Sequence, residues 1–153
     1  MSGVKELGHL VLYVRDVGRS ADFYRDVLGW HQVFPEPDQR PTVVAAFSSG
    51  RTHHELLLIE VGADAQALPT GRHIGLYHFG LKVGDTDDEL REALARVESA
   101  GTPVVGSSDH GVTHSLYILD PDGNEIELYI DVAEVDWRAD PAKVLSPIRP
   151  LRL

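Results

Sequence analysis

The chain has 153 residues, 42% of them hydrophobic and 25% charged, so it is long enough to bury the core of one globular domain without disulfides or a structural metal. It has no cysteine, which excludes a disulfide framework, a thiolate-bound zinc or iron–sulfur centre and a cysteine nucleophile, and which fits a cytoplasmic protein. The formal net charge of −10 disfavours nucleic acid and anionic membranes as partners, and no segment is typical of a signal peptide or a membrane span.

The first half of the chain predicts a strand, a helix and three further strands. Ser20 is the predicted N-cap of the helix, and Gly29 follows its last turn in the position where helices often end. Each predicted strand is an apolar run bounded by Gly, Pro, Asp or Asn. These strands span residues Gly8–Val14, Trp30–Phe34, Thr42–Ser48 and His53–Val61.

The second half predicts the same order of elements. Thr86 and Glu89 form a capping box, apolar residues recur at helical spacing after it, and Gly101 and Pro103 end the helix. The predicted strands of this half are Leu76–Val83, Pro103–Ser108, His114–Leu119 and Glu125–Val132. The remaining residues, about 133–153, contain three prolines and are predicted to form an irregular arm.

The two halves are an internal repeat. The motif His-x-x-Leu-x-Val-x-Asp begins at His9 and again at His78, each time just before the predicted helix. The prediction is therefore one α+β domain over residues 1–153, built from two βαβββ modules at about 7–62 and 75–132. Because one module is too small to bury both faces of its sheet, we expect the two mixed sheets to pair.

A candidate metal site follows from the repeat and from one hairpin. The turn Asp120-Pro-Asp-Gly-Asn124 places Tyr117 opposite Glu127 on one face of the hairpin. A carboxylate in mid-strand needs a partner if it faces inward, and a metal is one such partner. His9, His78 and Glu127 would supply two imidazoles and one carboxylate, a set that suits Fe(II) and that Mn, Zn or Ni also accept. The competing interpretation is two buried, hydrogen-bonded strand histidines and a solvent-facing glutamate.

Four segments share their order and spacing with a known family, namely Gly8–Asp16, Ser20–Gly29, Leu76–Leu81 and Asp120–Tyr129. They resemble the vicinal oxygen chelate superfamily, which includes glyoxalase I, methylmalonyl-CoA epimerase, fosfomycin and bleomycin resistance proteins and type I extradiol dioxygenases. The resemblance covers about residues 7–132. It implies paired βαβββ modules that form a cup around a metal, with the family's ligand positions at His9, His78 and Glu127. It also implies a homodimer.

Within this superfamily the chain is most similar to catechol 2,3-dioxygenases. The segment Asp109–Tyr117 resembles their active-site segment, which implies a supporting histidine at His110 and a substrate-facing tyrosine at Tyr117, although the stretch is about two residues shorter here. The segment His53–Ile59 resembles the strand that carries their acid/base histidine, which implies that role for His54. The implied reaction is ring cleavage of a catechol-type aromatic diol with Fe(II) and O2.

Two alternatives stay open at this point. A glyoxalase- or epimerase-type isomerase or lyase would need a fourth protein ligand, for which Glu55 and Glu60 are candidates, whereas a dioxygenase would have His54 facing inward. A non-catalytic drug-binding resistance protein is the other alternative, and retention of all three candidate ligands argues against it. No role is assigned to four other histidines, namely His31, His53, His73 and His114.

Overall fold

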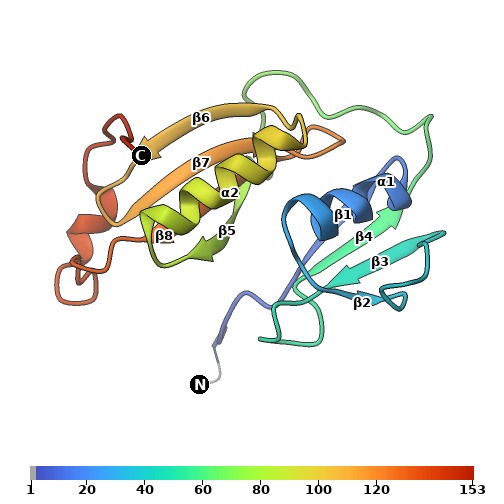
Figure 1. Ribbon diagram of the computed structural model, residues 1–153, viewed down its shortest axis with the longest axis horizontal. Helices are drawn as coiled ribbons and strands as arrows, with labels where there is room; N and C mark the ends of the chain where they lie inside the picture. The colour runs from blue at the N-terminus through green and yellow to red at the C-terminus, as the bar shows by residue number, and fades with distance from the viewer. Residues whose placement is uncertain (1–2) are drawn as a thin grey trace. The chain divides into compact units, whose positions relative to one another are not determined.

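The computed structural model describes residues 3–153, which divide into two compact units. The first unit extends to Ala67 and the second is Leu68–Leu153. Each contains one four-stranded mixed sheet, and the order strand, helix and three strands occurs in both (Figure 1). This confirms the predicted α+β class and the repeated βαβββ order.

The first unit has strand order β1-β4-β3-β2, with β1 parallel to β4 and the other neighbours antiparallel. Its strands are shorter than predicted. Both candidate histidines of this unit therefore lie in loops, His9 one residue before β1 and His54 two residues before β4. The strands are β1 (Leu10–Val14), β2 (Gln32–Phe34), β3 (Val44–Phe47) and β4 (Leu56–Glu60).

The first helix begins earlier than predicted. α1 spans Val17–Asp22 and continues as a π-helical turn over Phe23–Val27. Its N-cap is Asp16, whose Oδ1 accepts a hydrogen bond from the Arg19 backbone N–H at 2.8 Å. The prediction of Ser20 as N-cap is wrong, because Ser20 lies fully buried within the helix. The weak helix propensity of the first two helical residues, valine and glycine, hides this start in the sequence.

This corrected cap gives a stability prediction. Asp16→Ala is expected to lower the free energy of unfolding by about 1 kcal/mol, because it removes the acceptor at the helix start. Ser20→Ala is expected to cost much less, since the buried Ser20 hydroxyl has no hydrogen-bond partner within residues 3–153. Urea denaturation of both variants shows which substitution lowers the free energy of unfolding more. A larger decrease for Ser20→Ala would contradict the cap assignment.

The second unit has strand order β5-β8-β7-β6, again with one parallel pair, β5 and β8. α2 (Asp87–Ser99) begins with the predicted capping box of Thr86 and Glu89 and lies across one face of the sheet (Figure 1). The strands are β5 (His78–Gly84), β6 (Val104–Asp109), β7 (Thr113–Leu119) and β8 (Glu125–Asp131).

Strand alternation gives this second sheet two different faces. Buried apolar side chains occupy the face that α2 covers, and the alternate positions carry the polar candidates. The buried set comprises Leu90, Ala93, Val97, Leu116, Ile118, Ile126, Leu128 and Ile130. The predicted hairpin is confirmed, because Tyr117 pairs with Glu127 in the β7–β8 register and the Asp120 N–H donates to the Asn124 carbonyl at 2.9 Å.

The C-terminal arm contains a 3-10 helix, Pro141–Leu145, and is attached to β6. Asp109 and Arg149 exchange two backbone hydrogen bonds, each 2.9 Å long, as an isolated antiparallel bridge. No helix within residues 3–153 is long and apolar enough to cross a membrane.

Candidate functional site

The predicted site residues are divided between the two units. His9 and His54 belong to the first unit, whereas His78, His110, Tyr117 and Glu127 belong to the second. Across the described part of the chain, no group of three or more His, Asp or Glu side chains is arranged to hold a metal ion.

In the second unit, His78 and Glu127 come together on the sheet face opposite α2. His78 is the first residue of β5, and Glu127 pairs with Gly80 two residues further along the same strand. The His78 Nε2 lies 3.3 Å from Glu127 Oε2. A side chain at position 80 would crowd this site, because a Cβ there would lie 3.1 Å from the Tyr129 ring and 3.7 Å from Glu127 Oε2.

This pair has donor chemistry that fits a divalent metal. Two ligands in adjacent positions, each about 2.1 Å from one ion, lie about 3 Å apart, which is close to the separation of His78 Nε2 and Glu127 Oε2. The His78 Nδ1 is buried and makes no hydrogen bond within residues 3–153, and Glu125 Oε1 lies 3.5 Å from it. A carboxylate beside the second ring nitrogen is a common way to orient a ligating histidine. Sequence reasoning missed Glu125, although it shares the strand face of Glu127 and sits two residues before it.

Tyr117 connects Glu127 to His110. The Tyr117 hydroxyl donates to Glu127 Oε1 at 3.4 Å and lies 2.7 Å from His110 Nε2. The contact with His110 is the shorter of the two, and which partner donates in it depends on the tautomer of His110. Burial, followed by the negative charge of Glu127, raises the pKa of Tyr117 to about 12, so the phenol keeps its proton at neutral pH.

In the first unit, His54 lies beside His9. The two ring centroids are 4.6 Å apart, and the His53 ring is 4.4 Å from that of His54. Partial burial, together with the neighbouring imidazoles of His53 and His9, lowers the pKa of His54. His9 is exposed and His54 half-buried. The structure thus places the predicted ligand and the predicted acid/base residue of this unit next to each other.

The two candidates for a fourth ligand have other partners. Both carboxylate oxygens of Glu55 are used, since Oε2 accepts from the Ser49 N–H and hydroxyl at 2.5 Å and Oε1 accepts from Arg51 Nε at 2.9 Å. Burial alone would raise the pKa of Glu55, but these hydrogen bonds and the Arg51 charge outweigh burial and lower it. Glu60 Oε2 accepts from the Val17 N–H at 2.9 Å, at the start of α1.

Comparison with known proteins places the chain in one superfamily and finds relatives in two enzyme classes. Residues 6–128 match the model of the Glyoxalase/Bleomycin resistance protein/Dioxygenase superfamily. A catechol-2,3-dioxygenase of Bacillus subtilis is 37% identical over 134 residues, which is 88% of this chain and 44% of that protein. A lactoylglutathione lyase of Neisseria meningitidis is 31% identical over 124 residues, which is 78% of this chain and 86% of that protein.

A solved structure supports the same fold. The lactoylglutathione lyase of Agrobacterium tumefaciens superimposes with a TM-score of 0.60 and 30% identity, covering 84% of this chain and 96% of that one. The chain therefore spans less than half of the length of the Bacillus relative but nearly the whole length of the two lyases.

Proposed function

We propose that this chain, which belongs to the Glyoxalase/Bleomycin resistance protein/Dioxygenase superfamily, is an extradiol dioxygenase that cleaves the ring of a catechol-type aromatic diol. The observation that carries the proposal is the hydrogen-bonded series His110, Tyr117 and Glu127, which joins a proton donor to a proposed metal ligand. The sequence similarity to a catechol-2,3-dioxygenase supports the same class.

The proposed metal ligands are His9, His78 and Glu127, with Fe(II) as the preferred ion and Mn, Zn or Ni as ions that such a set also accepts. When bound, Fe(II) with three protein ligands leaves open positions for the two oxygens of a diol and for O2. The pairing of His78 Nε2 with Glu127 Oε2 at 3.3 Å supports this assignment for the half of the set that lies in the second unit.

The other residues are proposed to bind the substrate and to move protons. Tyr117 keeps its proton and holds it next to Glu127, so its hydroxyl is positioned to donate to a diol oxygen near that carboxylate. His110 holds the phenol in place through the 2.7 Å bond. His54, beside His9, is proposed to exchange a proton with the substrate as the ring opens.

A lactoylglutathione lyase-type activity is the second candidate, favoured by the match to nearly the full length of two such enzymes. An enzyme of that type would use a fourth carboxylate ligand. The involvement of Glu55 with Ser49 and Arg51, and of Glu60 with the Val17 N–H, argues against this candidate.

A Glu55→Gln variant distinguishes the two candidates. We expect iron content and ring-cleaving activity to stay at the level of the unsubstituted protein, while the free energy of unfolding falls by about 1 kcal/mol because charge-assisted hydrogen bonds to Ser49 and Arg51 are weakened. Metal analysis, activity and urea denaturation give the three values. Loss of bound metal in this variant would instead identify Glu55 as a ligand and favour the lyase.

The proposed function is tested by loading the metal-free protein with Fe(II) under anaerobic conditions and then adding catechol and air. We expect a yellow ring-fission product that forms only when both Fe(II) and O2 are present. A parallel sample loaded with Ni(II) or Zn(II) is assayed for lactoylglutathione formation. No yellow product across several substituted catechols, together with lactoylglutathione in the parallel sample, would overturn the dioxygenase in favour of the lyase.

A further inference from the structure

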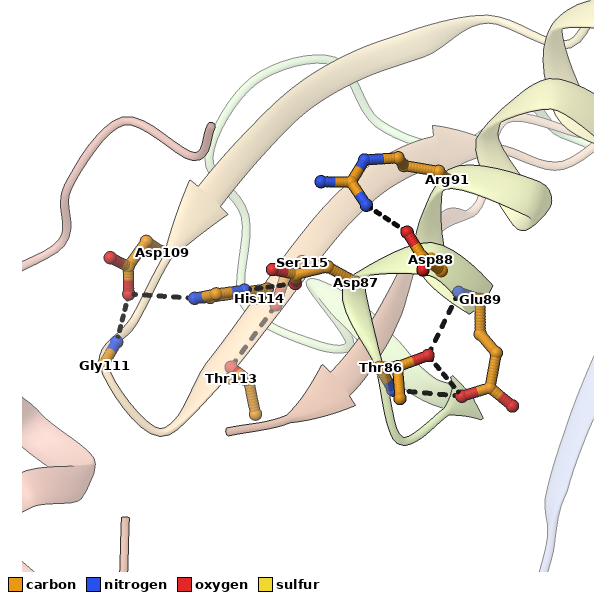
Figure 2. Close-up of polar contacts among 10 residues, drawn as sticks. All are labelled: Thr86, Asp87, Asp88, Glu89, Arg91, Asp109, Gly111, Thr113, His114 and Ser115. Carbon is orange, nitrogen blue, oxygen red and sulfur yellow. Dashed lines mark hydrogen bonds and ion pairs between the residues drawn. The ribbon is translucent and has the colours of Figure 1, made fainter. Parts of the chain in front are cut away.

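His114 lies outside the proposed active site and has its own set of charged neighbours. His114 lies three residues before Tyr117 on β7 and therefore has the opposite strand parity. It lies on the sheet face that α2 covers and pairs with Asp109 of β6 in the register. His114 Nδ1 is 2.6 Å from Asp87 Oδ1 at the start of α2, and Nε2 is 3.9 Å from Asp109 Oδ1. Figure 2 shows the imidazole between these two carboxylates.

A pocket of about 420 Å³ opens at this cluster, on the second unit. The C-terminal arm forms much of its wall, and the Asp109–Arg149 bridge holds the arm in place. The pocket is lined by Asp109, His114, Arg149, Pro150, Leu151 and Arg152.

The two arginines give this pocket its chemistry. Arg149 and Arg152 are exposed, and neither guanidinium makes an ion pair or hydrogen bond within residues 3–153, in a chain whose formal net charge is −10. Guanidinium groups present paired N–H donors that match the oxygens of a carboxylate or a phosphate. Two such residues without acidic partners, both lining one pocket, favour an anionic ligand.

The histidine adds a third polar group to the pocket wall. Asp87 accepts from Nδ1, which leaves Nε2 as the ring nitrogen on the side of Asp109. When Nε2 also carries a proton, it is a further donor for an anion, and Asp87 compensates the added charge. Asp109 opposes an anion, although its Oδ1 already accepts the Gly111 N–H at 2.7 Å.

We propose that this pocket is a second ligand site, which binds a small organic anion through a carboxylate or phosphate group held by Arg149, Arg152 and His114. A cation is the less favoured ligand, because the arginines repel it and no metal-binding group of three acidic or histidine side chains occurs within residues 3–153. The proposal goes beyond the proposed dioxygenase function, since it uses the opposite face of the second sheet.

The full chain is titrated with inorganic phosphate and, separately, with succinate, and binding is followed by calorimetry and by the backbone N–H signals of Gly111 and Arg149. We expect saturable binding of at least one probe, and the probe that binds identifies a phosphate or a carboxylate group as the ligand chemistry. The double variant Arg149→Gln/Arg152→Gln is expected to weaken binding by about tenfold or more, because it removes two charged donors. The control Arg91→Gln/Arg96→Gln removes the same charge from the exposed face of α2 and is expected to leave binding unchanged.

Asp109→Asn tests whether the negative charge of Asp109 weakens anion binding. Asparagine keeps an acceptor for the Gly111 N–H but removes the negative charge, so anion binding is expected to become tighter. Absence of saturable binding for both probes, equal weakening in the control variant, or weaker binding in Asp109→Asn would each overturn the proposal. The last result would point to a cation at this pocket.

Discussion

Replacing His78 by alanine is expected to abolish stable iron binding and to lower ring-cleaving activity by at least about a hundredfold. His78 Nε2 lies 3.3 Å from Glu127 Oε2, so the substitution removes one of the two proposed ligands that this unit contributes. Substituting a group that only supports a metal ligand typically lowers metal affinity or activity by about 10- to 100-fold. Loss of a ligand itself should lower them by at least as much. Iron per chain after anaerobic Fe(II) loading and the rate of yellow product formation give the two values.

The fold should survive this change, because the His78 side chain is partly exposed at the start of β5 and its Nδ1 makes no hydrogen bond within residues 3–153. Circular dichroism of His78→Ala checks this point. The matched control is His73→Ala, which removes an exposed imidazole of the same unit whose one hydrogen bond among the described residues is to the Gly71 carbonyl. Unchanged iron content in His78→Ala would show that the ligand assignment is wrong.

Replacing Ile126 by alanine is expected to lower the free energy of unfolding by about 2–5 kcal/mol. Ile126 is completely buried in β8, where it pairs with Phe79 on one side and Ile118 on the other. Truncation removes buried apolar surface and leaves a cavity between two strands and α2. The shift in the urea midpoint, at unchanged slope, measures the loss.

The control for this prediction is Val105→Ala on β6. Val105 is 51% exposed, so its truncation should change the free energy of unfolding by no more than about 0.5 kcal/mol. A loss for Ile126→Ala as small as that for Val105→Ala would show that the α2-covered face of the second sheet is not the core that the structure indicates.

Local sequence signals predicted the second unit well. The capping box of Thr86 and Glu89 and the Asp120–Asn124 turn are determined by hydrogen bonds between residues close in the chain, and both are present. The Asp120–Asn124 turn also determines the pairing of Tyr117 with Glu127, because the length and type of the turn determine the register of a hairpin. The shared face of these two residues was therefore predictable before the structure.

The ends of the first unit's strands were not predictable in the same way. The run His53–Val61 is apolar enough to be expected as one strand, but β4 begins only at Leu56, and the Glu55 side chain is hydrogen-bonded to Ser49 and Arg51 of the preceding loop. His54 consequently lies in a loop beside His9, and strand alternation does not determine its direction. The contact between His54 and His9 joins residues far apart in the sequence, so no local pattern predicts it.

The charged pocket at His114 was also not predictable from the sequence. Asp87, Asp109 and Arg149 come from α2, β6 and the C-terminal arm, and no local pattern connects them in the sequence. Strand parity separated His114 from Tyr117, but only the packed unit shows that Asp87 is hydrogen-bonded to Nδ1 and that Asp109 lies 3.9 Å from Nε2.

The most direct test of the proposed function is the stoichiometry of oxygen uptake. The Fe(II)-loaded protein is given a limiting amount of catechol in an oxygen electrode while the absorbance of the ring-fission product is recorded. A ring-cleaving dioxygenase predicts that one O2 is consumed for each catechol lost, with a yellow product formed in equal amount. Full iron loading with no oxygen uptake on any substituted catechol would contradict the proposal.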